Sequence, residues 1–508
     1  MANSILKSIQ DTITKNLYNE KAVFVFPTDV ASFSWAEWVV KNTDCKAVER
    51  NRFLAWDHFK NNIDGNKTET RNPVPSLLRK MFAVNLMEEN ARNPFLESVI
   101  AKEYAQDSVS FASWISGVLP KLGEWHAKIM LADKSLPENS LSDKENKDYN
   151  EIFERYKKFL SENNLFEPSW ETKELFEDSK IYYIFFPEIL DDYNDYEKFF
   201  DGKEKLKNIN VIHANDFDDV ITADFFSNAK TELRKTALHI RKLHYEKNIP
   251  WTDITLCAPD LDMYLPYIER ELKLYCIPYV VRSGRSMTKG SAGSFFIDVL
   301  DCYNNKFSYS TVQKLLLNKF VPWKDLKLNE NLVREGAKRK CICSYEDGKD
   351  IWEESLSSVN TGNTCERELA FYKKFKSCVE TFGKATNFSA VRKAWNECKT
   401  VLFDADKFES DESANSIFGR CLSVLEDFIK LEGDFKMSVS NPFKIWTEEI
   451  DSSSYQPQQT KAGVSIFKYK VTAAAYFPYQ FIVDANQKGL SIQNNSLKFL
   501  TEQKRRAL

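Results

Sequence analysis

Three cations stand close together in a segment that also holds glycine and serine: Arg282, Arg285 and Lys289. They follow a β-branched run at residues 278–281. Loops after parallel strands face the ligand crevice in open α/β sheets, and guanidinium and ammonium groups bind phosphate. We therefore predict that these three side chains contact phosphate groups. The formal net charge of the chain is -4, so any polyanion must be held by such a local patch or by a partner subunit.

Other residue types could assist the same chemistry. Two further basic runs are weaker candidates for phosphate contacts, Lys338–Lys340 and Lys504–Arg506. Aromatic rings can stack on nucleotide bases above a basic groove. The side chains with that potential are Trp35, Trp38, Tyr476 and Tyr479.

A nucleotide site is not expected in this chain. A phosphate-binding loop needs glycines, a lysine and Ser or Thr directly after a buried strand. Residues 27–35 follow the strand-like run Val23–Phe26 and contain neither glycine nor lysine. Glu188 and Asp191 follow a later strand-like run and are expected to be solvated loop carboxylates. We predict no catalytic residues, no nucleotide-binding residues and no cofactor.

Metal and membrane binding are not expected either. The ten cysteines are scattered and the five histidines show no HExxH pattern, so reduced, mostly buried thiols and no metal site are predicted. No run approaches the roughly 20 apolar residues of a membrane span, and the first residues lack a signal-peptide core. A cytoplasmic location is the expectation.

The elements that would position these residues alternate between strand regions and helical blocks. Short apolar runs predict strands buried in parallel sheets, and long tracts with helical spacing of apolar residues separate them. The predicted strands lie at residues 22–27, 180–187, 209–213, 253–259, 278–282, 463–467 and 480–484. An α/β protein with two parallel-sheet domains, each holding a large helical insertion, fits this order.

The middle of the chain resembles a known family. The helix at residues 227–243 carries Glu232-Leu233-Arg234, and the strand after the next helix carries Ile277-Pro278-Tyr279. This run resembles the second RecA-like domain of UvrD-like superfamily 1 helicases, especially the AddB/RexB-type subunit of helicase–nucleases. The resemblance implies the following domains: a first RecA-like domain at 1–70 and 173–224 with an insertion at 71–172, and a second at 225–292 and 461–508 with an insertion at 293–460.

The resemblance also implies a function. We expect a non-catalytic, helicase-like subunit or fragment of an exodeoxyribonuclease V-like or AddAB-like complex, which binds DNA as a scaffold during double-strand break repair and recombination. DNA and an active helicase–nuclease subunit are the expected partners. The chain ends where the family's PD-(D/E)XK nuclease domain is expected to begin. Two alternatives stay open: an ATP-dependent DNA helicase with a divergent nucleotide site, and an unrelated two-domain α/β metabolic protein.

Overall fold

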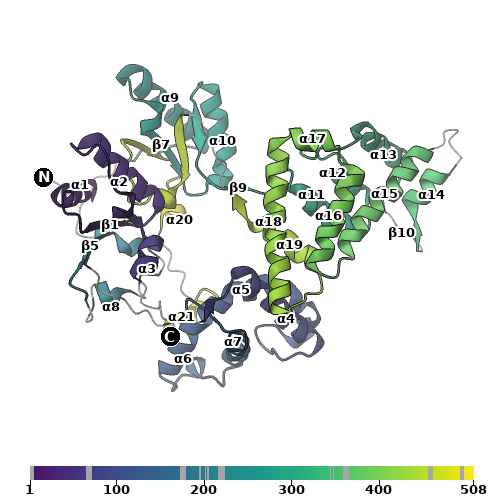
Figure 1. The fold of residues 1–508 in the computed structure, drawn as a ribbon, viewed down its shortest axis with the longest axis horizontal. Coiled ribbons are helices and arrows are strands. Elements are labelled where there is room, and N and C mark those ends of the chain that lie inside the picture. Colours follow the sequence, from purple (N-terminus) through teal and green to yellow (C-terminus); the bar gives the residue numbers. More distant parts are fainter. Residues whose placement is uncertain are drawn as a thin grey trace. The chain divides into compact units, whose positions relative to one another are not determined.

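The computed structural model describes residues 5–63, 71–171, 179–190, 192–193, 196–200, 202, 205–214, 223–343, 345–346, 348–358, 365–455, 462–491 and 497–508. These residues form two compact units. Unit 1 comprises residues 1–70, 171–283 and 458–500, and unit 2 comprises residues 71–170, 284–457 and 501–508. The chain therefore passes between the units several times (Figure 1).

Unit 1 contains two parallel four-stranded sheets. The first has the order β2-β1-β5-β6 and the second the order β14-β7-β13-β8. Their strands are β1 (Ala22–Phe26), β2 (Phe53–Ala55), β5 (Ile181–Phe185), β6 (Ile209–Ile212), β7 (Ile254–Ala258), β8 (Tyr279–Val281), β13 (Val464–Lys468) and β14 (Tyr479–Ile482). The helices of this unit are α1 (Ile5–Asn16), α2 (Asp29–Asn42), α3 (Trp56–Ile63), α8 (Glu197–Phe200), α9 (Ala229–Lys247), α10 (Leu261–Leu274) and α20 (Gln487–Leu490).

The strand pairing confirms the predicted α/β architecture. Val23 pairs with Tyr182 in the first sheet, and Leu256 pairs with Phe481 in the second. All five residues of β1 and of β7 are buried, as their continuous apolar runs predict.

Helices cover both faces of the first sheet. On one face, Phe24 packs in a core that includes Ile13 of α1 and Trp35 of α2. On the other face, Val25 packs in a core that includes Phe59 of α3. This double cover is the arrangement that period-2 alternation inside a fully buried strand requires. In the second sheet, the described core joins the strands to α9 and α10, which lie side by side (Figure 1).

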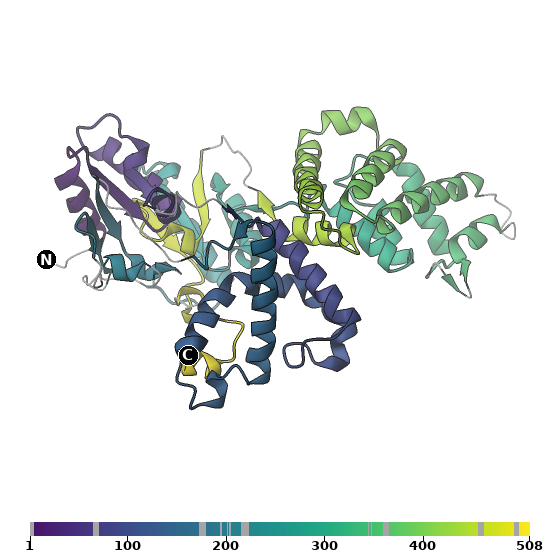
Figure 2. The same cartoon turned by 60° about the horizontal axis from the view of Figure 1, so that its bottom comes forward.

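Unit 2 is mainly helical, and Figure 2 shows its longer block as a bundle of packed helices. The block at 71–170 holds α4 (Ser76–Arg92), α5 (Ala112–Val118), α6 (Leu122–Leu131) and α7 (Lys144–Glu162). The block at 284–457 holds α11 (Ser294–Asn304), α12 (Tyr309–Leu316), α13 (Leu326–Lys338), α14 (Ile351–Ser357), α15 (Glu366–Gly383), α16 (Phe388–Leu402), α17 (Ala405–Ser410), α18 (Glu412–Phe435) and α19 (Pro442–Ser452). The terminal helix α21 (Glu502–Ala507) belongs to this unit.

Short strands accompany these helices. They form the pairs β3 (Asn72–Pro73) with β4 (Leu165–Phe166), β9 (Arg285–Ser286) with β12 (Ser454–Tyr455), and β10 (Tyr345–Glu346) with β11 (Lys349–Asp350).

The units group the predicted segments differently from the domain order in the sequence. Both predicted insertions fall in unit 2 and both sheets fall in unit 1. Residues 284–292 and 501–508, which the sequence assigns to the second sheet domain, lie in unit 2. Across the described ranges, every helix is too short or too polar to cross a lipid bilayer.

Candidate functional site

The turn after β1 occupies the place where a P-loop domain holds phosphate. Here the chain passes from Phe26 through Pro27 and Thr28 directly into α2. The Thr28 hydroxyl accepts a hydrogen bond from the Ala31 backbone N–H at 3.1 Å, which caps the helix. Asp29 lies in the first turn, with one carboxylate oxygen 3.5 Å from His58 Nε2. A carboxylate at this helix end uses the electrostatic field that would otherwise attract a phosphate group.

Aromatic side chains fill the space beside this turn. Trp35 is fully buried, and its ring stacks on Phe26 with 6.4 Å between the ring centroids. Its indole N–H donates to the Ala474 carbonyl at 2.7 Å, and the Tyr476 N–H donates to the Ser34 hydroxyl at 2.9 Å. The connection between β13 and β14 is thereby fixed onto α2 within unit 1.

This packing corrects part of the stacking prediction. Trp35 and Trp38 are buried and contact each other and Tyr476, so these rings pack in the core and are unavailable to stack on bases. Tyr479 begins β14 and is half-buried.

The carboxylate after β5 also has protein partners. Phe186 adopts a left-handed backbone conformation with φ of 53°, and Glu188 follows it after Pro187. Glu188 Oε1 accepts from the Ala214 N–H at 3.1 Å and lies 2.7 Å from His213 Nδ1. Glu188 is therefore a structural link between the ends of β5 and β6, not the solvated loop carboxylate expected from the sequence. Asp191 lies outside the described residues.

A neighbouring carboxylate is occupied in the same way. Asp192 Oδ1 accepts from the Trp56 indole N–H at 2.7 Å, and Asp192 Oδ2 accepts from the Lys60 ammonium group. Burial lowers the pKa of Lys60, but its bonds to Asp192 and Asp57 outweigh burial and raise the pKa overall. The ammonium group therefore stays charged and bound to carboxylates. In the part of the chain that the structure describes, no three His, Cys, Asp or Glu side chains gather as metal ligands.

The residues that carry the family resemblance lie around α9. Glu232 accepts a hydrogen bond from the Asp484 N–H at 2.9 Å, which joins α9 to the end of β14. Arg234 Nε lies 4.0 Å from the buried Glu271 of α10. The Tyr264 hydroxyl donates to Asp484 at 3.1 Å, and burial and this carboxylate raise the pKa of Tyr264 to about 12. These side chains position the elements of the second sheet and are occupied by protein partners.

The three predicted phosphate contacts have exposed side chains but lie in different units. Arg282 belongs to unit 1, where its N–H donates to the Ile466 carbonyl at 2.7 Å. Arg285 and Lys289 belong to unit 2, where Arg285 pairs with Tyr455 in the β9–β12 ribbon. Among the described residues, none of the three forms an ion pair. The cations are free to bind an anion, and their common role stays a prediction.

The two weaker basic runs are largely neutralised. Lys338 pairs with Glu335 at 2.7 Å, and Lys504 pairs with Asp143 and Glu145 at 2.5 and 2.8 Å. Arg506 pairs with Glu502 of its own helix. These runs therefore offer few free cations.

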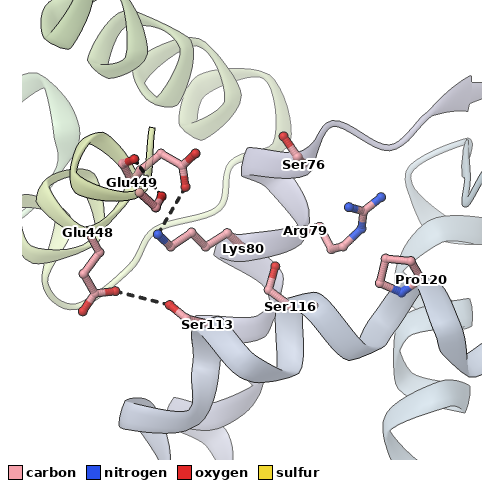
Figure 3. A pocket seen from close by; sticks show the side chains of 10 residues that line it. Ser76, Arg79, Lys80, Ser113, Ser116, Pro120, Glu448 and Glu449 are labelled. Carbon is pink, nitrogen blue, oxygen red and sulfur yellow. Dashed lines mark hydrogen bonds and ion pairs between the residues drawn. The ribbon is translucent and has the colours of Figure 1, made fainter. Parts of the chain in front are cut away.

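Unit 2 contains a polar pocket of about 470 Å³ between α4, α5 and α19 (Figure 3). Lys80 Nζ lies 3.2 Å from Glu449 Oε2, and the Ser113 hydroxyl donates to Glu448 at 3.4 Å. The lining residues are Ser76, Arg79, Lys80, Ser113, Ser116, Gly117, Pro120, Glu448, Glu449 and Ser452. Hydroxyl groups and paired charges suit a neutral polar group better than a phosphate, because the carboxylates repel an anion.

A buried ion pair supports this pocket from within the helical block. Arg79 Nε and Nη2 each donate at 3.0 Å to the two oxygens of Glu167, which is 2% exposed. The Tyr156 hydroxyl donates to Glu167 at 2.8 Å. Burial and the Glu167 charge raise the pKa of Tyr156. The sequence gives no local signal for this network, because Arg79 and Glu167 are 88 positions apart.

Comparisons with known proteins agree with the fold. Residues 9–213 match the family described as the Treponema TP0900 N-terminal P-loop domain, and residues 288–456 match the one described as the Treponema TP0900 fourth helical domain. A Treponema pallidum (strain Nichols) protein with the name "Uncharacterized protein" is 24% identical over 526 residues. The alignment covers 94% of this chain and 66% of the relative, so the chain spans about two thirds of that protein's length. The first sheet thus has a P-loop type of fold, although its turn after β1 lacks the glycines and lysine of a P-loop.

Proposed function

We propose that this chain is a non-catalytic, helicase-like scaffold that binds DNA and acts beside an active helicase–nuclease subunit in the repair and recombination of double-strand breaks. The observation that carries the proposal is the turn after β1. A P-loop type of sheet is retained, but Thr28 and Asp29 occupy the phosphate position and Trp35 fills the space beside it. Such a sheet supports architecture and partner binding rather than nucleotide turnover.

The resemblance around Glu232 and Ile277 supports the choice of a DNA-processing complex. Glu232 and Arg234 contact the neighbouring elements of the second sheet, so the segment with the most specific family resemblance also organises this part of the fold. The phosphate-binding role then falls to exposed cations that have no carboxylate partner, because the net charge of the chain is -4.

Two measurements on the full 508-residue chain test the proposal. We expect binding to DNA that weakens with rising salt, because phosphate contacts release counterions. We expect no binding of a fluorescent ATP analogue under the same conditions. Nucleotide binding would favour the alternative of a helicase with a divergent site, and absence of DNA binding would favour a metabolic protein.

The partner can be identified in the native host. Capture of the tagged chain followed by mass spectrometry should recover a protein with intact helicase motifs and a nuclease domain. Recovery without such a protein, in a strain that expresses one, would contradict the scaffold role.

A further inference from the structure

The helix α9 concentrates positive charge in a chain that is acidic overall. Its 19 residues hold six lysines and arginines and two glutamates, whereas the whole chain has a formal charge of -4. One glutamate, Glu232, is partly buried and engaged with the Asp484 N–H. The other, Glu246, lies 3.7 Å from Lys242 at the exposed end of the helix. Cations therefore dominate the solvent-exposed side of this helix.

The exposed side is a continuous surface, which we call the α9 outer face. The buried side of α9 holds Leu233, Ala237, Ile240 and Leu243, so residues about 100 to 180° away around the helix face solvent. The α9 outer face consists of Lys230, Lys235, Leu238, Arg241, Lys242 and Tyr245, all of which are exposed. From Lys230 to Tyr245 it extends about 22 Å at 1.5 Å per residue.

The cations of this face are available to a ligand. Among the described residues, Lys230, Lys235 and Arg241 form no ion pair with a carboxylate. Lys235 lies 5.6 Å from the Phe226 ring, a contact that leaves its charge uncompensated. Arg234, by contrast, compensates the buried Glu271 and is not counted as part of the face.

An aromatic ring and a shallow hollow complete the face. Leu238, Arg241, Lys242, Tyr245 and Glu246 line an open hollow of about 360 Å³. Tyr245 is 63% exposed, and the Arg241 guanidinium lies 5.3 Å from its ring centroid. An exposed ring beside unpaired cations is the combination that single-strand binders use, with bases stacked on the ring and phosphates bound by the cations.

We infer that the α9 outer face binds single-stranded DNA, with Arg241, Lys242 and Lys235 on successive phosphates and Tyr245 stacked on a base. The charge of the face fits a polyanion, and Tyr245 and Leu238 fit the flat, apolar surface of an unpaired base. This inference rests on the proposed DNA-binding function and adds the position of the strand and its single-stranded form.

The test compares two triple variants of the full chain. Lys235→Gln/Arg241→Gln/Lys242→Gln removes three charges from the face, and glutamine keeps a good helix propensity. Lys7→Gln/Lys15→Gln/Lys21→Gln is the matched control, because these three exposed lysines lie in the same unit and also lack ion pairs among the described residues. All six positions are exposed, so thermal unfolding should match wild type for both variants.

Binding to a fluorescent single-stranded oligonucleotide is titrated between 50 and 200 mM salt. The α9 variant should lose roughly 0.7 of log–log salt slope per contact, so the affinity drop across this range should shrink roughly 20-fold. The control should keep the wild-type slope. Tyr245→Ala should weaken single-strand binding about fivefold to a hundredfold and leave duplex binding unchanged.

The outcomes separate this inference from the proposed function. Wild-type DNA binding with an unchanged slope in the α9 variant overturns the inference and leaves the proposed function standing. An equal loss in the control variant, or an equal response to polyglutamate, also overturns it, because the effect is then one of general charge. Absence of DNA binding by wild type counts against the proposed function itself.

Discussion

At the scale of residues, the turn after β1 shows how a phosphate site can be replaced by packing. The Thr28 hydroxyl satisfies a free N–H at the start of α2, and Asp29 supplies the negative charge that this helix end favours. A nucleotide phosphate would have to displace both groups and accept repulsion from the Asp29 carboxylate. The three-residue connection from Phe26 to α2 also leaves no loop to wrap around a phosphate.

We therefore expect no DNA-stimulated ATP hydrolysis by the purified chain. Release of phosphate should equal the background without protein, on single-stranded and forked DNA alike. The control is Glu188→Gln, which alters the carboxylate after β5 without touching the turn. Turnover in wild type that Glu188→Gln or Asp191→Ala abolishes would restore the divergent-helicase alternative.

The buried ion pair of Arg79 and Glu167 gives a second prediction at this scale. Glu167→Gln removes the charge that Arg79 and Tyr156 both contact and should cost about 3 kcal/mol of unfolding free energy, because Arg79 is left uncompensated. Glu162→Gln is the control, since Glu162 is 63% exposed and lies 3.8 Å from Lys158. Urea unfolding with hydrogen exchange in α4 and α7 measures both. Equal losses in the two variants would mean that the network adds no stability.

At the scale of elements, the sequence predicts the strands that are buried on both faces. β1 and β7 are continuous apolar runs, and each forms a central strand of its sheet. β2 was missed because it has only three residues and its apolar pattern continues into α3. The pairs β9–β12 and β3–β4 were also missed, because two-residue strands are defined by distant partners and leave no local periodicity.

The site was less predictable than the fold for a related reason. The absence of a P-loop is visible in the residues after Phe26, but the contact of Trp35 with Ala474 joins positions 439 apart. Glu188 likewise gave no sign of its bond to Ala214, which lies on the loop after another strand. A sequence pattern shows residue types and local spacing, whereas these roles depend on which distant segments meet.

The terminal helix α21 provides a prediction at this scale. Lys504 joins α21 to the start of α7 through Asp143 and Glu145, and six residues are too few for a helix that is stable alone. Lys504→Gln should therefore increase amide hydrogen exchange in α21 to the rate of an unfolded segment. Arg506→Gln is the control, because Arg506 is 79% exposed and pairs only with Glu502. Equal protection in Lys504→Gln and wild type would show that other contacts hold the helix.

The same contact should depend on pH. Burial raises the pKa of Asp143, but its bonds with Lys504 and backbone N–H groups outweigh burial and hold the pKa below 3.8. The stabilisation is then complete above pH 3.8 and is lost as the pH falls through the lowered pKa. Exchange in wild-type α21, corrected for the intrinsic rate, should rise only in that acid range. A rise between pH 5 and 7 would contradict the assignment to Asp143.

At the scale of the whole molecule, the chain separates sheets from helices although it interleaves them in sequence. Both helical blocks enter and leave the sheet unit at defined points, near residues 70, 170, 283 and 458. One of these points is flanked by Arg282 in unit 1 and by Arg285 and Lys289 in unit 2. A polyanion bound at all three would contact both units at a place where the chain passes between them.

Neutralising Arg282, Arg285 and Lys289 together tests this arrangement. All three side chains are exposed, so the change to glutamine should leave folding intact. Binding should weaken alike for all DNA sequences, because phosphate contacts carry no base information, and the salt slope should fall by roughly 0.7 to 0.9 per lost contact. The measurement is a titration of wild type and variant on single-stranded and forked DNA at several salt concentrations. A slope reduced only by the α9 triple variant would place the phosphate contacts on α9 alone. A reduction of about one third from Arg282→Gln alone, with no further loss from Arg285 and Lys289, would confine binding to unit 1.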